Sequence, residues 1–351
     1  MNNEPIIMKK SASNILLSIC IPTFNRADYL RDAIKYILPA VNNMNEIVEL
    51  IISDNCSTDG TLEILKELPM SPWIHCVRNE TNLGALKNGL NCIDLAKGKY
   101  IWFVGDDDVI RPEGLTHLIQ VLNDHRDIDY FVVNAITLSN DQRNNLSDII
   151  NNDAISKQQN TKFKSLSDKE ISTFNEYIDP NFDPIFLGAM MCNVLRRSIW
   201  QKGVTGIDPN AQMGSVVGTY LVCTILARYM VGKPSFYVGF PCSLAFWGHQ
   251  EWQGFMPIIF AYTFYSVLDC YEEHGIEPWR IDKCRRYLHQ KSAMAIYRLA
   301  LFRSLPGKEL FSFRLHFRRY WKHYELWKGL LILPFKSIGP YLLSRFRGIR
   351  K

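Results

Sequence analysis

The first 135 residues alternate between short apolar runs and segments in which apolar residues recur every three or four positions. Short apolar runs bounded by turn-forming residues are typical of strands buried on both faces of a sheet, and the longer repeats predict helices. This alternation predicts an α/β fold with a mostly parallel sheet flanked by helices. The expected strands are 16–22, 48–54, 73–77, 100–104 and 130–135, and the expected helices are 27–38, 61–68, 83–96 and 112–123.

A polar segment directly follows each of the first four expected strands. Because ligands bind outside the carboxyl ends of the strands in open α/β sheets, we expect these segments to lie together at one edge. Any one of them could be an ordinary turn, but four in succession predict a binding site. The segments are Pro-Thr-Phe-Asn-Arg at 22–26, Asp-Asn-Cys-Ser-Thr-Asp-Gly at 54–60, Asn-Glu-Thr-Asn-Leu-Gly at 79–84 and Gly-Asp-Asp-Asp at 105–108.

The last of these segments contains three adjacent carboxylates, Asp106, Asp107 and Asp108. Neighbouring carboxylates repel one another, so a fold that keeps them together usually places a cation beside them. Mg²⁺ and Mn²⁺ bind one or two carboxylates and complete their coordination with phosphate oxygens. The run therefore predicts a site for a divalent cation, Mn²⁺ or Mg²⁺. The alternative is a solvated acidic turn before the helix that begins at Pro112.

Residues 16–115 resemble the nucleotide-sugar-binding half of family 2 glycosyltransferases, which have the GT-A fold. The likeness rests on the first strand ending in Ile-Pro-Thr-Phe-Asn-Arg, the Asp-Asn-Cys-Ser-Thr-Asp-Gly-Thr segment, Asn-Leu-Gly at 82–84 and the acidic run. In its Gly-Asp-Asp-Asp form, the acidic segment resembles that of bacterial O-antigen transferases, including abequosyltransferase-like enzymes. The resemblance implies metal-dependent, inverting transfer of a sugar from a nucleotide-sugar donor to a saccharide acceptor, in surface polysaccharide synthesis.

The resemblance also assigns roles to single residues. Asp108 would be the direct metal ligand, Asp106 would contact the ribose or a metal-bound water, and Asp107 would help to position the donor. The loop after the first strand would line the base and ribose. Asp54, supported by Asn55, would hydrogen-bond the base or the ribose. Lys87 would stand near the diphosphate. The other residues implied in donor binding are Pro22, Thr23, Asn25, Arg26 and Asn82.

The catalytic base is harder to place. Family members usually carry it in an acidic pair after a segment like Arg196-Arg197, but Asp208 is the only carboxylate between Arg197 and Tyr229. Asp208 is the first candidate, although an Asp-Pro pair also suits a turn, and Glu251 is the second. His249 could ligate the metal or contact the diphosphate, or it could be a structural residue among aromatic neighbours.

The end of the chain is strongly basic. Residues 303–351 contain 12 Lys and Arg against 2 Asp and Glu, a net charge of +10, whereas the rest of the chain carries −5. Aromatic and basic residues alternate there, a pattern that favours binding to an anionic membrane surface. Helices packed on the body of the protein are the alternative. Nucleic acid is not expected, because no recognised nucleic-acid-binding module accompanies the charge.

Three regions are expected. Residues 1–135 form the nucleotide-sugar-binding half, 136–252 the acceptor-binding half with a mobile loop at 139–170, and 253–351 a helical, basic, membrane-associating region. The nine cysteines are scattered without a CxxC pair, no secretory signal is recognisable, and the longest apolar run (254–268) is too short to span a bilayer. These features predict a cytoplasmic protein, peripheral on the inner face of the cell membrane.

The sequence therefore predicts a glycosyltransferase whose saccharide acceptor is carried on a lipid. A nucleotidyltransferase of related α/β architecture is one alternative, since it also uses paired acids and Mg²⁺. A catalytically inactive protein that binds nucleotide sugars is the other, and the missing acidic pair favours it.

Overall fold

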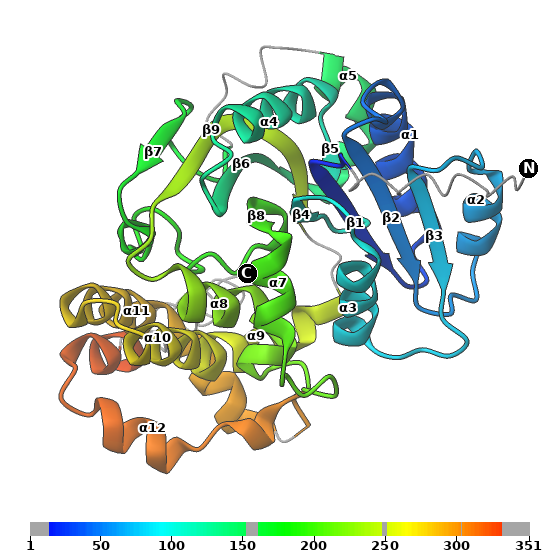
Figure 1. Ribbon diagram of the computed structural model, residues 1–351. Helices are drawn as coiled ribbons and strands as arrows, with labels where there is room; N and C mark the ends of the chain where they lie inside the picture. Colours follow the sequence, from blue (N-terminus) through cyan, green and yellow to red (C-terminus); the bar gives the residue numbers. More distant parts are fainter. Residues whose placement is uncertain (1–13, 152–160, 248–250, 303, 332–351) are drawn as a thin grey trace, which may run out of the picture.

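In the computed structural model the residues described are 14–151, 161–247, 251–302 and 304–331. Within them, nine strands form one sheet in the order β3-β2-β1-β4-β8-β6-β9-β5, and β7 pairs with β9 (Figure 1). The strands are β1 (Leu17–Thr23), β2 (Val48–Asp54), β3 (Ile74–Arg78), β4 (Tyr100–Phe103), β5 (Val109–Ile110), β6 (Tyr130–Ser139), β7 (Lys169–Ile171), β8 (Asn193–Arg196) and β9 (Ser235–Trp247).

The first four strands of this order pair in parallel, which confirms the predicted α/β class. Every residue of β2 and of β4 is buried, and this explains why both strands read as unbroken apolar runs in the sequence. The pairing sets Thr23 opposite Asp54, and Asp54 opposite Arg78. The carboxyl ends of β1, β2 and β3 therefore meet at one edge of the sheet, as the sequence predicts.

The second half of the sheet is mixed. β8 lies between β4 and β6 and runs antiparallel to both, while β6 and β9 pair in parallel. The direction of β8 could not be inferred from its apolar residues, because burial on both faces leaves the same pattern in either orientation. Strands from 1–135 and from 136–252 thus share one sheet, so the boundary expected between those two regions falls within it.

The helices divide between the two faces of the sheet. Alternate residues of a strand point to opposite faces: Ile19 and Ile52 pack in the core cluster beneath α1, α2 and α4, while Cys20 and Phe103 pack in the cluster shared with α3 and the later helices. The helices are α1 (Ala27–Asn43), α2 (Thr61–Glu67), α3 (Ala85–Leu95), α4 (Pro112–Asp124), α5 (Leu146–Asn151), α7 (Arg197–Val204), α8 (Val216–Met230), α9 (Met256–Ile258), α10 (Phe264–Glu273), α11 (Pro278–Leu301) and α12 (Phe313–Tyr320).

Part of the segment expected to be a mobile loop has regular structure. Ser139 and Gln142 form a capping box at the start of the 3₁₀ helix η1 (Asn140–Asn145), which leads into α5. Leu146 and Ile149 are buried against Leu138 of β6 and neighbouring residues of β9. Residues 152–160 lie outside the described residues. The apolar residues of α5 therefore anchor the first part of this segment to the sheet.

The chain after 250 is helical, as expected, and α10 packs on both α8 and α11 in the lower part of Figure 1. A further helix covers 324–331. None of the helices in the described ranges combines the length and the hydropathy that crossing a bilayer requires. The basic tail beyond 331 lies outside the described residues.

Two helix glycines provide a matched test of how closely α4 packs on the sheet. A Cβ at Gly114 would lie 2.5 Å from Cys242 Cα of β9, whereas one at Gly89 of α3 would meet nothing nearer than a ring carbon of Phe103 at 4.0 Å. We expect Gly114→Ala to lower the free energy of unfolding by about 1–3 kcal/mol. Gly89→Ala should raise it by up to about 1 kcal/mol through helix propensity. Denaturant unfolding measures both, and equal effects of the two substitutions would contradict this packing.

Candidate active site

The loops after β1 and β2 are tied together at the sheet edge. Asn25 and Cys56 have left-handed backbone conformations, with φ of 52° and 66°. Asparagine tolerates this region because its short side chain bonds to nearby backbone. The Asn25 side-chain oxygen accepts the Thr58 N–H (2.7 Å), and the Asn25 N–H donates to Ser57 Oγ (2.8 Å). Asn25, which was predicted to bind the nucleotide-sugar donor, therefore joins the two loops.

The acidic turn after β4 is bound by residues at the end of β1 and just after it. The Thr23 hydroxyl donates to Asp106 Oδ2 (2.7 Å), and Arg26 Nε lies 3.2 Å from Asp106 Oδ1. Arg26 Nη2 donates to Asp107 Oδ2 at 2.7 Å. Burial opposes the positive charge, yet Asp106 and Asp107 raise the pKa of Arg26 above its ordinary value. The predicted charge crowding is thus offset by an arginine of the same site.

Asp108 points differently from its two neighbours. It is buried, and its Oδ2 accepts the N–H of Gly105 at 3.3 Å. Burial, and then the nearby Asp107 carboxylate, raise the pKa of Asp108 well above its ordinary value. A Cβ at Gly105 would lie 2.6 Å from Asp107 Oδ1, so a side chain there would require the Asp107 carboxylate to move. The turn is therefore compact around Gly105.

Arg143 is a site residue that the sequence did not reveal. It lies in η1, donates to the backbone carbonyl oxygen of Asp107 and pairs with Asp32 of α1 at 3.0 Å. Its guanidinium also stacks on the rings of Tyr29 (4.6 Å) and Phe246 (4.4 Å). The one available signal was the capping pair Ser139 and Gln142, which indicates a helical turn in an otherwise polar segment.

Asp54 is fully buried, and both of its carboxylate oxygens have partners. Oδ1 accepts the Ser57 N–H at 3.0 Å, and Oδ2 accepts from Arg78 Nη1 at 2.5 Å. The guanidinium of Arg78 also donates to the Ser57 carbonyl at 2.7 Å. These contacts hold the loop after β2 in shape, and any contact of Asp54 with a ligand would add to them.

A network of asparagine side chains connects the loops after β2 and β3. Asn55 donates to Asn82 Oδ1 (2.7 Å), and its own oxygen accepts from Asn79 (3.1 Å) and from the N–H of Leu83 (2.8 Å). Beneath them Asn88, which is buried, donates to the Ser53 carbonyl (2.8 Å) and accepts from the Ser53 hydroxyl (2.7 Å) and Asn79 (2.9 Å). Amide side chains both donate and accept, so they can satisfy one another in a buried network.

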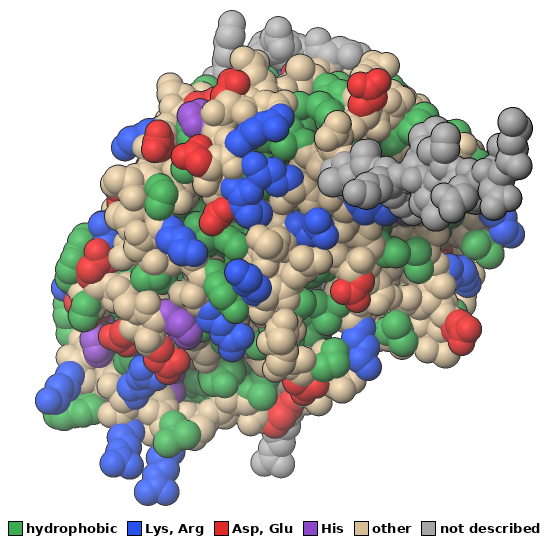
Figure 2. Space-filling model, viewed as in Figure 1, with side chains coloured by type: hydrophobic (Ala, Val, Ile, Leu, Met, Phe, Trp, Pro, Cys, Tyr) green, Lys and Arg blue, Asp and Glu red, His purple; other side chains and the backbone are tan. Residues whose placement is uncertain are grey.

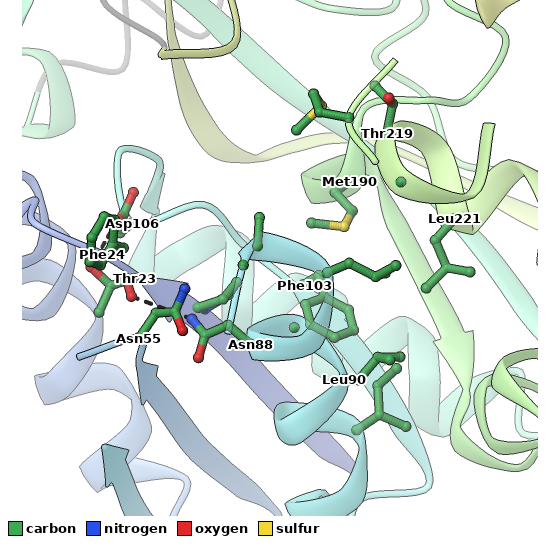
Figure 3. A pocket seen from close by; sticks show the side chains of 18 of the residues that line it. Thr23, Phe24, Asn55, Asn88, Leu90, Phe103, Asp106, Met190, Thr219 and Leu221 are labelled. Carbon is green, nitrogen blue, oxygen red and sulfur yellow. Dashed lines mark hydrogen bonds between the residues drawn. The ribbon is translucent and has the colours of Figure 1, made fainter. Parts of the chain in front are cut away.

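A cleft of about 510 Å³ opens beside these residues. At one end are Thr23, Asn55, Asn88 and Asp106, and at the other are apolar side chains that include Phe103 and Leu221 (Figure 3). Asp106 is the only carboxylate among the described residues that line it. Its walls come from the strand ends, α3, β4, α7 and the segment 213–221. The lining residues are Pro22, Thr23, Phe24, Arg26, Asn55, Asn82, Gly84, Ala85, Leu86, Asn88, Gly89, Leu90, Ile93, Phe103, Asp106, Met190, Trp200, Met213, Val217, Gly218, Thr219, Leu221 and Phe255.

The cleft brings together some of the residues singled out from the sequence and not others. The first group lines it directly: Pro22, Thr23, Arg26, Asn55, Asn82 and Asp106. The second group is not part of its lining: Asn25, Asp54, Lys87, Asp107, Asp108 and Asp208. Lys87 lies on α3 and is half-buried. The predicted donor-binding residues that line the cleft therefore come from the ends of β1, β2 and β4 and from the loop after β3.

Of the candidate bases, Asp208 does not line the cleft. Asp208 is exposed, and its Oδ1 accepts the N–H of Asn210 at 2.9 Å in a turn that includes Pro209. Asp208 therefore has the geometry of a turn residue, which is the alternative to a catalytic role that the sequence left open. Glu251 begins the 3₁₀ helix η4 (Glu251–Phe255), whose last residue, Phe255, lines the cleft. His249 lies outside the described residues.

The donor set of the acidic turn fits a hard divalent cation. In the described part of the chain, no three His, Cys, Asp or Glu side chains are grouped so that they could hold a metal ion. Mg²⁺, however, often takes only one or two carboxylates and completes its shell with water and substrate phosphates. Asp106 supplies such a carboxylate at the cleft, with Asp107 and Asp108 beside it. A cation could bind there together with a phosphate-bearing ligand once Arg26 releases Asp106.

Comparison with known proteins relates the segment that carries this site to one family. The family described as "Glycosyl transferase family 2" matches residues 18–182. Abequosyltransferase RfbV of Salmonella typhimurium is 38% identical over 120 residues, which cover 32% of this chain and 34% of that protein. An undecaprenol-linked glycan β-1,3-glucosyltransferase of Campylobacter jejuni is 32% identical over 110 residues, covering 31% and 35%. The similarity thus spans about a third of each of these relatives.

Solved structures share the fold over most of the chain. TarS 1-349 of S. aureus in complex with UDP has a TM-score of 0.53 at 16% identity, covering 88% of this chain and 78% of that one. Mannosyltransferase PcManGT of Pyrobaculum calidifontis, in complex with GDP-Man and Mn²⁺, has a TM-score of 0.50 at 14% identity, covering 90% and 83%. The fold is of the GT-A type. Residues 18–182 match the family 2 glycosyltransferase model, and the relatives similar to the chain within this segment are named as glycosyltransferases.

The amide network predicts a sharp difference between two asparagines. In Asn88→Asp, the Nδ2 group that donates to the Ser53 and Thr23 carbonyls is replaced by an acceptor, so buried acceptors face one another. We expect this substitution to lower the free energy of unfolding by at least about 2 kcal/mol. Asn43→Asp, at the exposed end of α1, should change it by less than about 0.5 kcal/mol. Chemical denaturation with both variants checks this, and a mild effect at Asn88 would count against the network.

Proposed function

We propose that the chain is a glycosyltransferase that moves a sugar from a nucleotide-sugar donor to a saccharide acceptor, with a divalent cation and with inversion at the anomeric carbon. The observation that carries the proposal is the Asp106 carboxylate, which lines the cleft and is held by Thr23 and Arg26 at the carboxyl ends of parallel strands. That is where open α/β sheets bind their ligands. These residues also lie inside the segment matched by the family.

The proposed chemistry assigns separate tasks to the two parts of the cleft. A Mn²⁺ or Mg²⁺ ion bound near Asp106 would neutralise the diphosphate leaving group without proton transfer. Asn55, Asn82 and the backbone around Gly84 offer polar groups to the nucleotide at the same end. The acceptor hydroxyl must lose its proton to a carboxylate during attack. Glu251 stays a candidate for that base, and Asp208 could serve only if its exposed turn approached the cleft.

We further propose a lipid-linked acceptor and a role in bacterial surface polysaccharide synthesis, including O-antigen. The support is the naming of the relatives: one acts on an undecaprenol-linked glycan and another is an abequosyltransferase. An acceptor carried by a lipid would require the enzyme to work beside a membrane. Such an enzyme needs an exposed surface that can contact the membrane.

The C-terminal helices offer such a surface, and we propose that it binds the anionic inner face of the cell membrane. Leu315 and Trp321 are 65% and 58% exposed, and Tyr324 is 65% exposed in the next helix. Arg314 and Arg318 of α12 are exposed among them. Figure 2 shows Lys and Arg side chains projecting from the lower edge of the molecule, where Figure 1 places α12. Exposed aromatics together with basic residues suit an interface with anionic lipid.

The catalytic proposal predicts a large effect at one carboxylate. Asp106→Asn should lower kcat for nucleotide release from the preferred donor by at least about 100-fold, because the cation loses a charged ligand. The assay screens UDP-, GDP-, CDP- and dTDP-sugars with Mn²⁺ and with EDTA. Asp94→Asn, at an exposed position on α3, is the matched control and should retain full activity.

Two outcomes of that assay would contradict the proposal. Donor binding without metal and without turnover would favour the inactive binding protein. Nucleotidyl transfer to a sugar phosphate would favour the nucleotidyltransferase.

The membrane proposal predicts weaker vesicle binding when the exposed apolar groups of this surface are removed. The double variant Leu315→Ala/Trp321→Ala should bind vesicles containing 30% anionic lipid at least about tenfold more weakly in a flotation assay, since each side chain contributes up to about 2 kcal/mol when buried. Met70→Ala, fully exposed beyond α2, should bind like the wild type. Equal binding by all three proteins, or no dependence on anionic lipid and salt, would remove this surface from the proposal.

A further inference from the structure

Arg26 borders the cleft and also contacts the acidic turn. Its predicted role was to line the base and ribose of the donor. In the structure its guanidinium bridges two carboxylates of the acidic turn, with Nε at 3.2 Å from Asp106 and Nη2 at 2.7 Å from Asp107. The side chain is only 18% exposed, yet it borders the cleft. Arg26 therefore occupies the carboxylates that a metal ion would use.

Both oxygens of Asp106 have partners in this arrangement. Oδ2 accepts the Thr23 hydroxyl, and Oδ1 faces the guanidinium of Arg26. A hydroxyl can remain beside a metal-bound carboxylate, but a guanidinium a few ångströms from a divalent cation repels it strongly in a partly buried site. A cation that binds Asp106 must therefore displace the Arg26 contact. The displaced guanidinium then needs another anion.

A second arginine keeps the turn partly neutralised after such a displacement. Arg143 donates to the Asp107 carbonyl, pairs with Asp32 and packs between the rings of Tyr29 and Phe246. It is not among the residues that line the cleft. Arg26 packs on the same Tyr29 ring at 4.7 Å but borders the cleft. Arg143 is thus the fixed positive charge of the turn, and Arg26 is the one within reach of a ligand.

We propose that Arg26 couples the binding of the divalent cation to the binding of a nucleoside diphosphate. Without nucleotide, Arg26 holds Asp106 and Asp107, and the cation binds weakly. When a diphosphate enters the polar end of the cleft, Arg26 moves to its oxygens and leaves Asp106 to the cation (Figure 3 shows Asp106 and Thr23 at this end). By linkage, the cation and the diphosphate strengthen each other's binding by the same factor. This inference rests on the metal-dependent function proposed above.

The test is Mn²⁺ binding to the full chain, measured by electron paramagnetic resonance of free Mn²⁺ with and without UDP, GDP or inorganic pyrophosphate. Arg26→Gln should bind Mn²⁺ alone about tenfold more tightly than the wild type, because the competing charge is gone. The same variant should bind each diphosphate more weakly, and its coupling factor should fall below that of the wild type to the part that direct coordination of Mn²⁺ by the diphosphate oxygens supplies. Arg26→Lys retains the charge and should retain the weak binding of Mn²⁺ alone. Arg31→Gln, an exposed partner of Asp28 on α1, is the control and should match the wild type.

Two results would overturn the inference, and they can be told apart. If the wild type binds Mn²⁺ more tightly with a diphosphate but folded Arg26→Gln binds Mn²⁺ alone no better than the wild type, the coupling role of Arg26 fails and the proposed function stands. If the wild type binds no Mn²⁺ even with all three diphosphates, the coupling role falls together with the proposed metal dependence. Circular dichroism and the Tm of each variant establish that it is folded.

Discussion

The parallel pairing of β1 with β2 and β4 is the constraint on which the site depends. Its register sets Thr23 opposite Asp54 and places Cys20 opposite Phe103, so the chain leaves all three strands at the same edge. The Val104 N–H still donates to the Cys20 carbonyl at 3.0 Å, which carries the pairing up to the start of the acidic turn. A slip of one residue would send Thr23 to the opposite face and remove its bond to Asp106. The apolar residues buried on both faces of these strands prevent such a slip.

Contacts with other side chains, rather than with solvent, hold the polar groups at this edge in position. Arg26 and Thr23 hold Asp106, Arg78 holds Asp54, and the asparagine network joins the loops after β2 and β3. The contacts of the buried Asp54 and Asn88 are rigid, because breaking any one of them leaves its partner unpaired, whereas Arg26 borders the cleft. The opposite wall of the cleft is apolar and comes from α3, α7 and the segment 213–221. The cleft thus combines a polar edge with an apolar wall to which both halves of the chain contribute.

The sequence predicted the parts of the fold that depend on local pattern. The strands 16–22, 48–54 and 100–104 were recognisable because burial on both faces leaves unbroken apolar runs, and the polar segments after them identified the site edge. Contacts between distant residues were not predictable. Arg26 meets Asp106 only because two strands pair, and Arg143 comes from a polar segment with little periodicity. The direction of β8 and the exposed turn at Asp208 depend in the same way on tertiary packing.

The site that we propose for joint binding of a divalent cation and a nucleoside diphosphate is the acidic turn beside Arg26. A crystal structure with Mn²⁺ and UDP or GDP, with the metal located by its anomalous scattering, tests this most directly. We expect one strong anomalous peak at coordination distance, about 2.2 Å, from the Asp106 carboxylate and from diphosphate oxygens, with Arg26 turned away from Asp106. A diphosphate bound elsewhere, or bound in the cleft with Arg26 still on Asp106 and no metal beside it, would contradict this proposal.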